Sequence, residues 1–335
     1  MKKIIYITVA FLISVNAVKS QDFHLSQYDL SPMLMNPAFT GLFDGQYRVH
    51  VQHRSQWSSI LENPFKTVHI SFDKPFKRFG AGILILNNRA GVGKFNFLNI
   101  ALSGSYEVTI DPSGIQHLVF GTQIGMVQNS FDLSQLTFDN QYTSAFGGSF
   151  DQTIDNGENF SKTSVIRPDV NFGVHYMMQQ RFNYFNYSVY KMSEIVPFGG
   201  AVIFHLTQPK LTFGEFKNTL YRRYVAYGGA RIKVNIPLCL EPKIMYMRQL
   251  NNNEFQFSTS AYYYIENYGA YAFSTLNLRP KDAFIVSLGA IYKDYRFSVG
   301  YDFNTSPLKA LTKGRGSFEI SITYTKFNNK SYPMF

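Results

Sequence analysis

Few residues in this sequence have the types and spacing that catalytic or metal-binding chemistry requires. The GVGK stretch, Gly91 to Lys94, lacks the upstream glycine and the Ser or Thr after Lys94 that a phosphate-binding loop needs, so we interpret it as a turn between strands. His50 and His53 lie three residues apart on a predicted strand. Their side chains should therefore point to opposite faces, and they cannot bind one metal ion from that strand.

The other candidate groups are scattered along the chain. His175, His205 and Ser287 show no spacing that singles them out as a Ser/His/acid arrangement. The single Cys239 excludes an internal disulfide and gives no support to a thiolate metal site. We therefore predict that the protein is not an enzyme and that it has no cofactor and no metal site.

The elements that carry these residues have the period of β-strands. In SFEISITYT, residues 317–325, the apolar Phe318, Ile320, Ile322 and Tyr324 alternate with polar residues. Period two is the signature of a strand whose two faces meet different surroundings. The same alternation recurs along the chain, in residues 47–57, 98–110, 284–292 and 295–303.

Composition bears on what the apolar faces touch. The 335 residues are 45% hydrophobic and only 16% charged, whereas soluble domains carry roughly 25% charged residues. The polar faces carry Ser, Gly, Asn, Gln and Thr rather than the Lys and Glu of a water-facing sheet, and aromatic residues stand at strand ends. We predict an all-β, antiparallel transmembrane β-barrel of the outer membrane; an exported soluble all-β protein is the alternative.

Turn signals divide the chain into about 14 strands. Compact turns are predicted at residues 73–78, 111–114, 279–282 and 292–295. An even number of strands returns the chain to the periplasmic side where it began. Residues 183–190 are a possible extra strand, which we interpret as part of a long turn. The predicted organisation is a signal peptide at 1–20, an N-terminal segment at 21–45, the barrel at 46–326 and a C-terminal tail at 327–335.

The start of the chain has the pattern of a secretory signal peptide. Lys2 and Lys3 precede an apolar run from Ile4 to Val15, which is too short to span a membrane as a helix. We predict cleavage after Ser20 and insertion into the outer membrane. The net charge is +10 for the whole sequence, and 10 − 3 = +7 without the predicted signal peptide, which carries Lys2, Lys3 and Lys19 and no acid. This positive charge should meet anionic lipid or an acidic protein surface rather than nucleic acid, because the chain is exported.

Charges outside the strands are distributed unevenly. The long connection 129–168 is predicted to lie outside the cell and is acidic, with Asp132, Asp139, Asp151 and Asp155. The connection 305–316 is basic, with Lys309, Lys313 and Arg315. Long loops of a compact barrel are often functional, although solvated surface is the alternative. Lumen-facing charges could pair to fill the barrel or could line a pore: Arg48, Arg54, Arg223, Arg231, Lys233, Lys243 and Arg296, with Glu107, Glu241 and Asp302.

Several short motifs cluster near the N-terminus. They are SQY (Ser26 to Tyr28), NPAFTG (Asn36 to Gly41), RSQW (Arg54 to Trp57) and PFKTVHISFD (64–73), with GRGSFEISITY (314–324) near the end. With these motifs the chain resembles the PorP/SprF family of type IX secretion and gliding-motility membrane proteins of Bacteroidetes. It departs from the family at Ser31, where Asn is more frequent, and in a tail that ends at Phe335 without cysteine.

The residues themselves indicate structural roles for these motifs. Pro37 and Gly41 would bracket a turn, and Asn36 before proline favours an extended conformation. Trp57 at a strand end would anchor at the membrane interface. The apolar residues around Met33 need cover, either inside the barrel mouth or on a partner.

The resemblance implies an outer-membrane barrel that works with the type IX machinery. Such a barrel would support secretion of a cargo or hold the cargo's C-terminal domain at the cell surface, and the alternative is a diffusion channel or ligand-uptake porin. Its expected partners are type IX components, a cargo C-terminal domain and outer-membrane lipid. The candidate partner-binding residues are Ser26, Gln27, Tyr28, Asn36, Pro37, Gly41, Arg54, Gln56 and Trp57, and the candidate cargo-loop residues are Asp132, Asp139, Asp151, Asp155, Lys309, Lys313 and Arg315.

Overall fold

The computed structural model describes residues 25–58, 61, 63–143, 149–155, 157, 162–178, 194–213, 218–235, 237–307 and 309–327. The predicted signal peptide with its cleavage site, the possible strand at 183–190 and residues 328–335 of the predicted tail lie outside this part of the chain. No described helix is long and apolar enough to cross a membrane.

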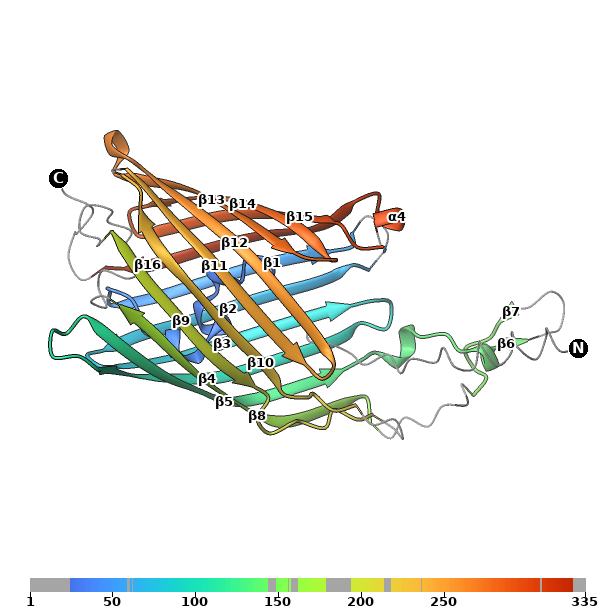
Figure 1. Ribbon diagram of the computed structural model, residues 1–335. Coiled ribbons are helices and arrows are strands. Elements are labelled where there is room, and N and C mark those ends of the chain that lie inside the picture. The colour runs from blue at the N-terminus through green and yellow to red at the C-terminus, as the bar shows by residue number, and fades with distance from the viewer. Residues whose placement is uncertain are drawn as a thin grey trace, which may run out of the picture.

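Fourteen antiparallel strands form one closed barrel, as predicted (Figure 1). The strands of the barrel are β1 (Tyr47–Gln56), β2 (Phe65–Phe76), β3 (Phe79–Ala90), β4 (Phe95–Thr109), β5 (Gln116–Ser130), β8 (Ser164–Met178), β9 (Ile195–Phe204), β10 (Arg223–Lys233), β11 (Leu238–Gln249), β12 (Asn252–Ile265), β13 (Ala270–Arg279), β14 (Ala283–Tyr292), β15 (Tyr295–Asn304) and β16 (Arg315–Lys326). β1 closes on β16, with Val51 opposite Ile322. Closure pairs the strand edges, as a lipid environment requires.

The period-two pattern of the sequence becomes an outer apolar face and an inner polar face. On β4 and β5, Leu102 and Ile124 are register partners on the outside, 66% and 62% exposed. The adjacent residues on the two strands, Ser103 and Gln123, are also register partners, and their side chains are buried in the lumen. Exposed apolar side chains around a barrel whose interior is polar are the arrangement of a membrane-spanning barrel.

The two ends of the barrel differ (Figure 1). Most connections at the end where β1 begins and β16 finishes are short, such as Lys77–Arg78, although the connection 179–194 between β8 and β9 also belongs to this end. We call this end the turn end. The opposite end, which we call the loop end, carries the connections 131–163, 205–222 and 305–314. Rings of Tyr47, Tyr295 and Tyr324 pack together at the turn end, with centroids 5.9 Å and 5.1 Å from Tyr324.

Some strands extend further than predicted. β2 continues to Phe76, so the predicted turn 73–78 shrinks to two residues, and β8 begins at Ser164, so the connection 129–168 is shorter. Both extensions pair with a neighbouring strand, which satisfies their backbone groups. The remaining connection contains an unpredicted hairpin of β6 (Tyr142–Thr143) and β7 (Ser149–Phe150) and the 3₁₀ helices η3 (Leu133–Gln135) and η4 (Asp139–Gln141).

We expect a charged residue on the outer face to destabilise the barrel more when it lies deeper in the membrane. Leu102→Arg, on the outer face within β4, should lower the free energy of unfolding by about 2–4 kcal/mol, whereas Ile110→Arg, just beyond the end of the same strand, should cost about 0–1 kcal/mol. The measurement is urea unfolding of the barrel in lipid vesicles. Equal costs at the two positions would contradict a membrane-spanning orientation.

Candidate functional site

The N-terminal segment lies inside the barrel. It folds into three short turns of helix, η1 (Tyr28–Leu30), α2 (Pro32–Met35) and η2 (Pro37–Phe39), and η2 packs against β4, β5 and β8. Most side chains from Leu25 to Phe43 are buried, including Met33 at 1% exposed. The apolar residues around Met33 were expected to be covered either by the barrel or by a partner. In the described part of the segment, the barrel interior covers them. We call residues 25–43 the plug.

Glycines of the barrel wall make room for the NPAFTG motif. A Cβ atom on Gly121 of β5 would collide with the backbone of Ala38, and one on Gly80 of β3 would collide with the carbonyl of Thr40. A Cβ atom on Gly173 of β8 would meet the side chain of Asn36. The close approach therefore depends on residues without a side chain at these wall positions.

Asn36 fixes the plug to the wall through both the oxygen and the nitrogen of its side-chain amide. Its Oδ1 accepts the backbone N–H of Ala38 at 2.9 Å and so caps η2. Its Nδ2 donates to the carbonyl of Val174 at 3.1 Å and to the Tyr227 hydroxyl at 2.9 Å. At the far end of the motif Gly41 takes a φ of +63°, as the predicted turn requires, and its N–H donates to Asp73 at 2.7 Å.

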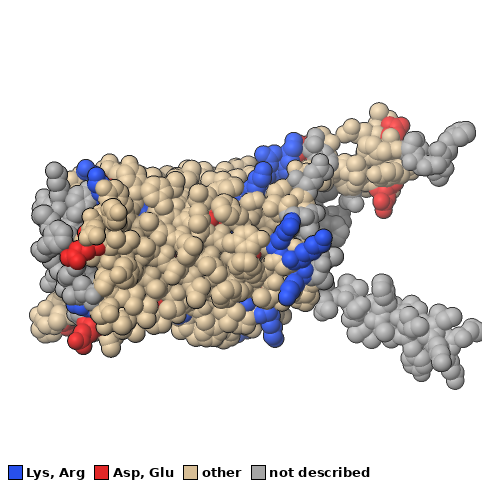
Figure 2. Space-filling model, turned by 90° about the horizontal axis from the view of Figure 1, so that it is seen from above, with Lys and Arg blue, Asp and Glu red and all other residues tan. Residues whose placement is uncertain are grey.

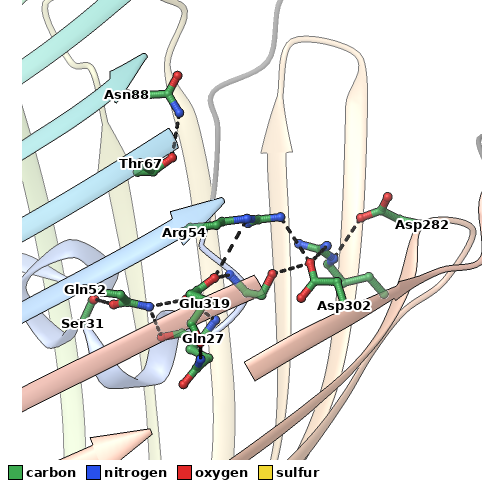
Figure 3. A network of polar contacts seen from close by, with 11 residues as sticks. Gln27, Ser31, Gln52, Arg54, Thr67, Asn88, Asp282, Asp302 and Glu319 are labelled. Carbon is green, nitrogen blue, oxygen red and sulfur yellow. Dashed lines mark hydrogen bonds and ion pairs between the residues drawn. The ribbon is translucent and has the colours of Figure 1, made fainter. Parts of the chain in front are cut away.

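The SQY motif is held by two buried carboxylates (Figure 3). The two oxygens of Glu319 accept the backbone N–H groups of Ser26 and Gln27, each at 2.9 Å. Asp302 accepts the Ser26 hydroxyl at 2.6 Å. The start of the plug is therefore tied to β15 and β16, the last two strands of the chain.

The same carboxylates partner buried arginines. Asp302 Oδ2 lies 3.2 Å from Arg54 Nη2 and 3.3 Å from Arg279 Nη2. Arg279 also pairs with Asp282, at 2.9 Å. Sequence reasoning missed Glu319 and Arg279, although Glu319 stands on the polar face of the SFEISITYT pattern. The alternation of Glu319 with apolar residues indicated that its side chain faces the lumen.

Further ion pairs fill the lumen rather than leave it as an open pore. Arg231 pairs with Glu241 at 2.6 Å, as the lumen-filling alternative expected. Lys243 pairs instead with Asp29 of the plug, at 2.6 Å. A third further pair, Arg48 with Asp73 at 2.6 Å, lies next to Gly41. Plug and wall thus share one network of charges.

Among the described residues, hollows lie at both ends of the barrel and between plug and wall. At the loop end a vestibule of about 660 Å³ is lined by polar and aromatic side chains, among them Trp57, Asn88 and Arg279. An apolar cavity of about 80 Å³ lies among plug and wall residues such as Leu34 and Met245. A third hollow, of about 120 Å³, involves Asp44 at the turn end.

The motif residues predicted as partner contacts occupy different places. Ser26, Gln27, Tyr28, Asn36, Pro37, Gly41 and Arg54 are buried in the lumen. Gln56 and Trp57 line the loop-end vestibule. Trp57 has a φ of +61° and packs edge-on against Phe65, with ring centroids 5.0 Å apart. The prediction of a membrane-interface anchor at Trp57 is therefore wrong, because the turn after β1 directs this ring to the vestibule.

The charged loop candidates lie on two separate structures of the loop end. Lys309 belongs to the short helix α4 (Lys309–Thr312), and Arg315 is the first residue of β16 rather than a loop residue. The acidic candidates lie in the connection that contains the β6–β7 hairpin, away from α4 (Figure 1). Asp132 pairs with Lys94 at 3.3 Å. A hydrogen bond from Ser134 lowers the pKa of this Asp132 carboxyl below its usual value.

Groups suited to metal binding do not converge among the described residues. His50 and His69 do lie close together, and the Ser31 hydroxyl is within hydrogen-bond distance of both rings, at 3.0 Å and 3.1 Å. No three His, Cys, Asp or Glu residues of this part of the chain are placed to hold a metal ion. His50 and His53 lie on opposite faces of β1, as predicted, and His205 pairs with Asp169 at 2.8 Å.

Comparison with known proteins matches this arrangement to a family. The model of the type IX secretion system membrane proteins PorP/SprF matches residues 17–324. The chain belongs to this family. The Ralstonia pickettii toluene transporter TbuX is similar in fold, with 11% identity, a TM-score of 0.52, and coverage of 89% of this chain and 94% of TbuX. The CymD monoaromatic hydrocarbon channel has 12% identity, a TM-score of 0.50, and coverage of 89% and 93%. No curated protein matches the sequence.

Family and fold together place this PorP/SprF barrel in the outer membrane as a component of type IX secretion. At such low identity, the likeness to TbuX and CymD concerns the barrel alone.

We expect the plug to close the barrel to ions. Purified wild-type protein in planar bilayers should show no stable open conductance, whereas Gly121→Val, whose side chain would displace the backbone of Ala38, should open the lumen. Gly104→Val is the matched control, because a Cβ atom there meets no atom closer than 3.8 Å. Similar conductance in the two variants would contradict a plug seated on Gly121.

We also expect the buried carboxylate to hold the fold together. Asp302→Asn removes the charge that partners Arg54 and Arg279 and should lower the free energy of unfolding by about 3 kcal/mol or more, because two buried cations lose a counter-ion. Asp139→Asn, on the exposed η4, should change it by less than about 0.5 kcal/mol. Urea unfolding measures both, and equal stabilities would contradict the network.

Proposed function

We propose that this type IX barrel holds the C-terminal domain of a secreted cargo at the cell surface. The observation that carries the proposal is the plug. Because residues 25–43 fill the lumen and share its ion pairs, a folded cargo has no passage through this barrel. A barrel of a secretion system that is closed in this way is suited to hold or dock a protein at its rim.

The loop end is the proposed docking end and faces the outside of the cell. The even strand number and the connections at the opposite end, which are short apart from 179–194, support this orientation, since outer-membrane barrels have short periplasmic turns and longer external loops. The signal peptide proposed for residues 1–20 would deliver the chain to that membrane. A role in gliding motility would follow if the cargo is a surface adhesin.

Two loop-end structures of opposite charge offer contacts to the cargo. The hairpin connection carries Asp139, Asp151 and Asp155, while α4 and the start of β16 carry Lys309, Lys313 and Arg315. Between them, the vestibule of about 660 Å³ presents Trp57 and polar side chains. Complementary charge on both structures would favour one orientation of the cargo domain.

The turn end would face the periplasmic components of the machinery. Residues 25–43 are enclosed by the barrel, so contacts at this end would come from the strand turns and from the exit of the plug near Asp44 and Gln46. The family motifs SQY and NPAFTG would then influence partners by positioning that exit, not by contacting the partners directly.

A ligand-uptake channel is the second candidate. The apolar cavity of about 80 Å³ between Leu34 of the plug and Met245 of the wall favours it, because such a cavity suits a small apolar ligand. Stable open conductance of the wild-type protein in planar bilayers would support this candidate over the anchor.

We expect a pull-down from native outer membranes to retain the C-terminal region of a large secreted protein. Replacing Lys309, Lys313 and Arg315 by Gln should reduce that recovery roughly tenfold, because rim charges steer association. Lys77→Gln with Arg78→Gln, at the turn end, is the control and should retain the cargo. Failure to recover such a partner, with secretion intact in a deletion strain, would remove the proposal.

A further inference from the structure

Lys and Arg gather at the loop end of an otherwise weakly charged wall (Figure 2). Exposed cations occur there on or beside many strands, at Lys66, Arg89, Lys94, Lys162, Arg167, Lys210, Arg222, Arg248, Lys281, Lys309, Lys313 and Arg315. Several belong to loops that reach into water. A few stand on the strands themselves and point away from the lumen, and these face the surroundings of the barrel.

Lys66 of β2 and Arg89 of β3 are the clearest case. They are register partners and both are exposed on the outer face, so two positive charges stand directly opposite each other. Like charges in this position destabilise a sheet. Within the described residues no carboxylate pairs with either of them. An anion from outside the chain would remove the repulsion.

The neighbouring strand adds a donor to the same row. Asn96 of β4 is the register partner of Arg89 on its other side. The Oδ1 of Asn96 accepts a hydrogen bond from Asn87 at 2.8 Å, which leaves its amide N–H groups to donate elsewhere. Lys66, Arg89 and Asn96 thus form one row of donors, which we call the basic row.

The depth of the basic row relates it to the lipid. Four residues further along the same strands, the outer face carries Ile70, Ile85 and Ile100, which are also register partners. At roughly 3.3 Å per residue, this apolar row lies about 13 Å along the strands from the basic row. The donors therefore stand where the hydrocarbon ends and lipid head groups begin.

A similar row stands on the other side of the barrel. Arg248 of β11 points outward at the loop end, between its register partners Tyr224 of β10 and Asn253 of β12. In the strand order of the barrel, β11 is seven strands from β2. Outward cations at the head-group level therefore occur on opposite sides, as contact with surrounding lipid would require.

We propose that the basic row of Lys66, Arg89 and Asn96 binds the phosphate of a lipid of the outer leaflet. The phosphate would lie between the two cations and accept from the Asn96 amide, while the acyl chains would pack on Ile70, Ile85 and Ile100. The proposal rests on the orientation given under the proposed function, with the loop end outside. It requires no cargo.

Native mass spectrometry of the detergent-solubilised barrel, titrated with bisphosphorylated lipid A, tests the proposal. The wild type should bind this lipid and should bind its dephosphorylated form much more weakly. Lys66→Gln with Arg89→Gln should weaken binding roughly tenfold or more, because both cations that face the phosphate lose their charge. Lys77→Gln with Arg78→Gln, one Lys and one Arg at the turn end, should bind as the wild type does.

Three results would overturn the proposal: wild-type binding that is independent of phosphate, undiminished binding by the Lys66/Arg89 variant, or an equal loss in the turn-end control. The comparison of lipids on the wild type tests the requirement for phosphate even if a variant fails to fold, which the migration of unboiled protein on gels reveals. Cargo recovery is not measured, so failure here leaves the anchoring function untouched, and failure of anchoring leaves lipid binding testable.

Discussion

The structure depends on the pairing of charges that the barrel encloses. A closed strand cylinder in lipid has an interior of limited size, and every buried charge in it needs a counter-charge or hydrogen bonds. Asp302 and Glu319 meet this need from the wall, by holding Arg54 and the first residues of the plug together. Plug and wall are therefore parts of one interior, and neither satisfies its polar groups without the other.

This shared interior explains why the family motifs are located where they are. NPAFTG fits wall positions that lack side chains, such as Gly121 and Gly173, and SQY supplies N–H and hydroxyl donors to acids of the last strands. The motifs thus join the beginning of the chain to its end. A plugged barrel within a secretion system is better suited to hold a protein at its rim than to conduct it.

The two ends of the barrel offer different surfaces for the proposed role of holding a cargo. The turn end has mostly short connections and tyrosines at the closing seam, Tyr47 and Tyr324. The loop end combines the acidic connection that contains the β6–β7 hairpin, the basic residues of α4 and the start of β16, and a vestibule. In the proposed lipid site the outward Lys66 and Arg89 would face lipid rather than a partner, so lipid and cargo would meet adjacent surfaces.

The sequence by itself determined the barrel, its fourteen strands and the side of each strand that faces lipid, because period-two alternation is local and each residue's neighbours carry it. Only the tertiary structure decided that Glu319 binds Ser26, that Lys243 pairs with Asp29, and that the ring of Trp57 turns to the vestibule. These contacts join residues up to 293 positions apart. They depend on register, on closure and on the path of the plug through the lumen, which no local pattern contains.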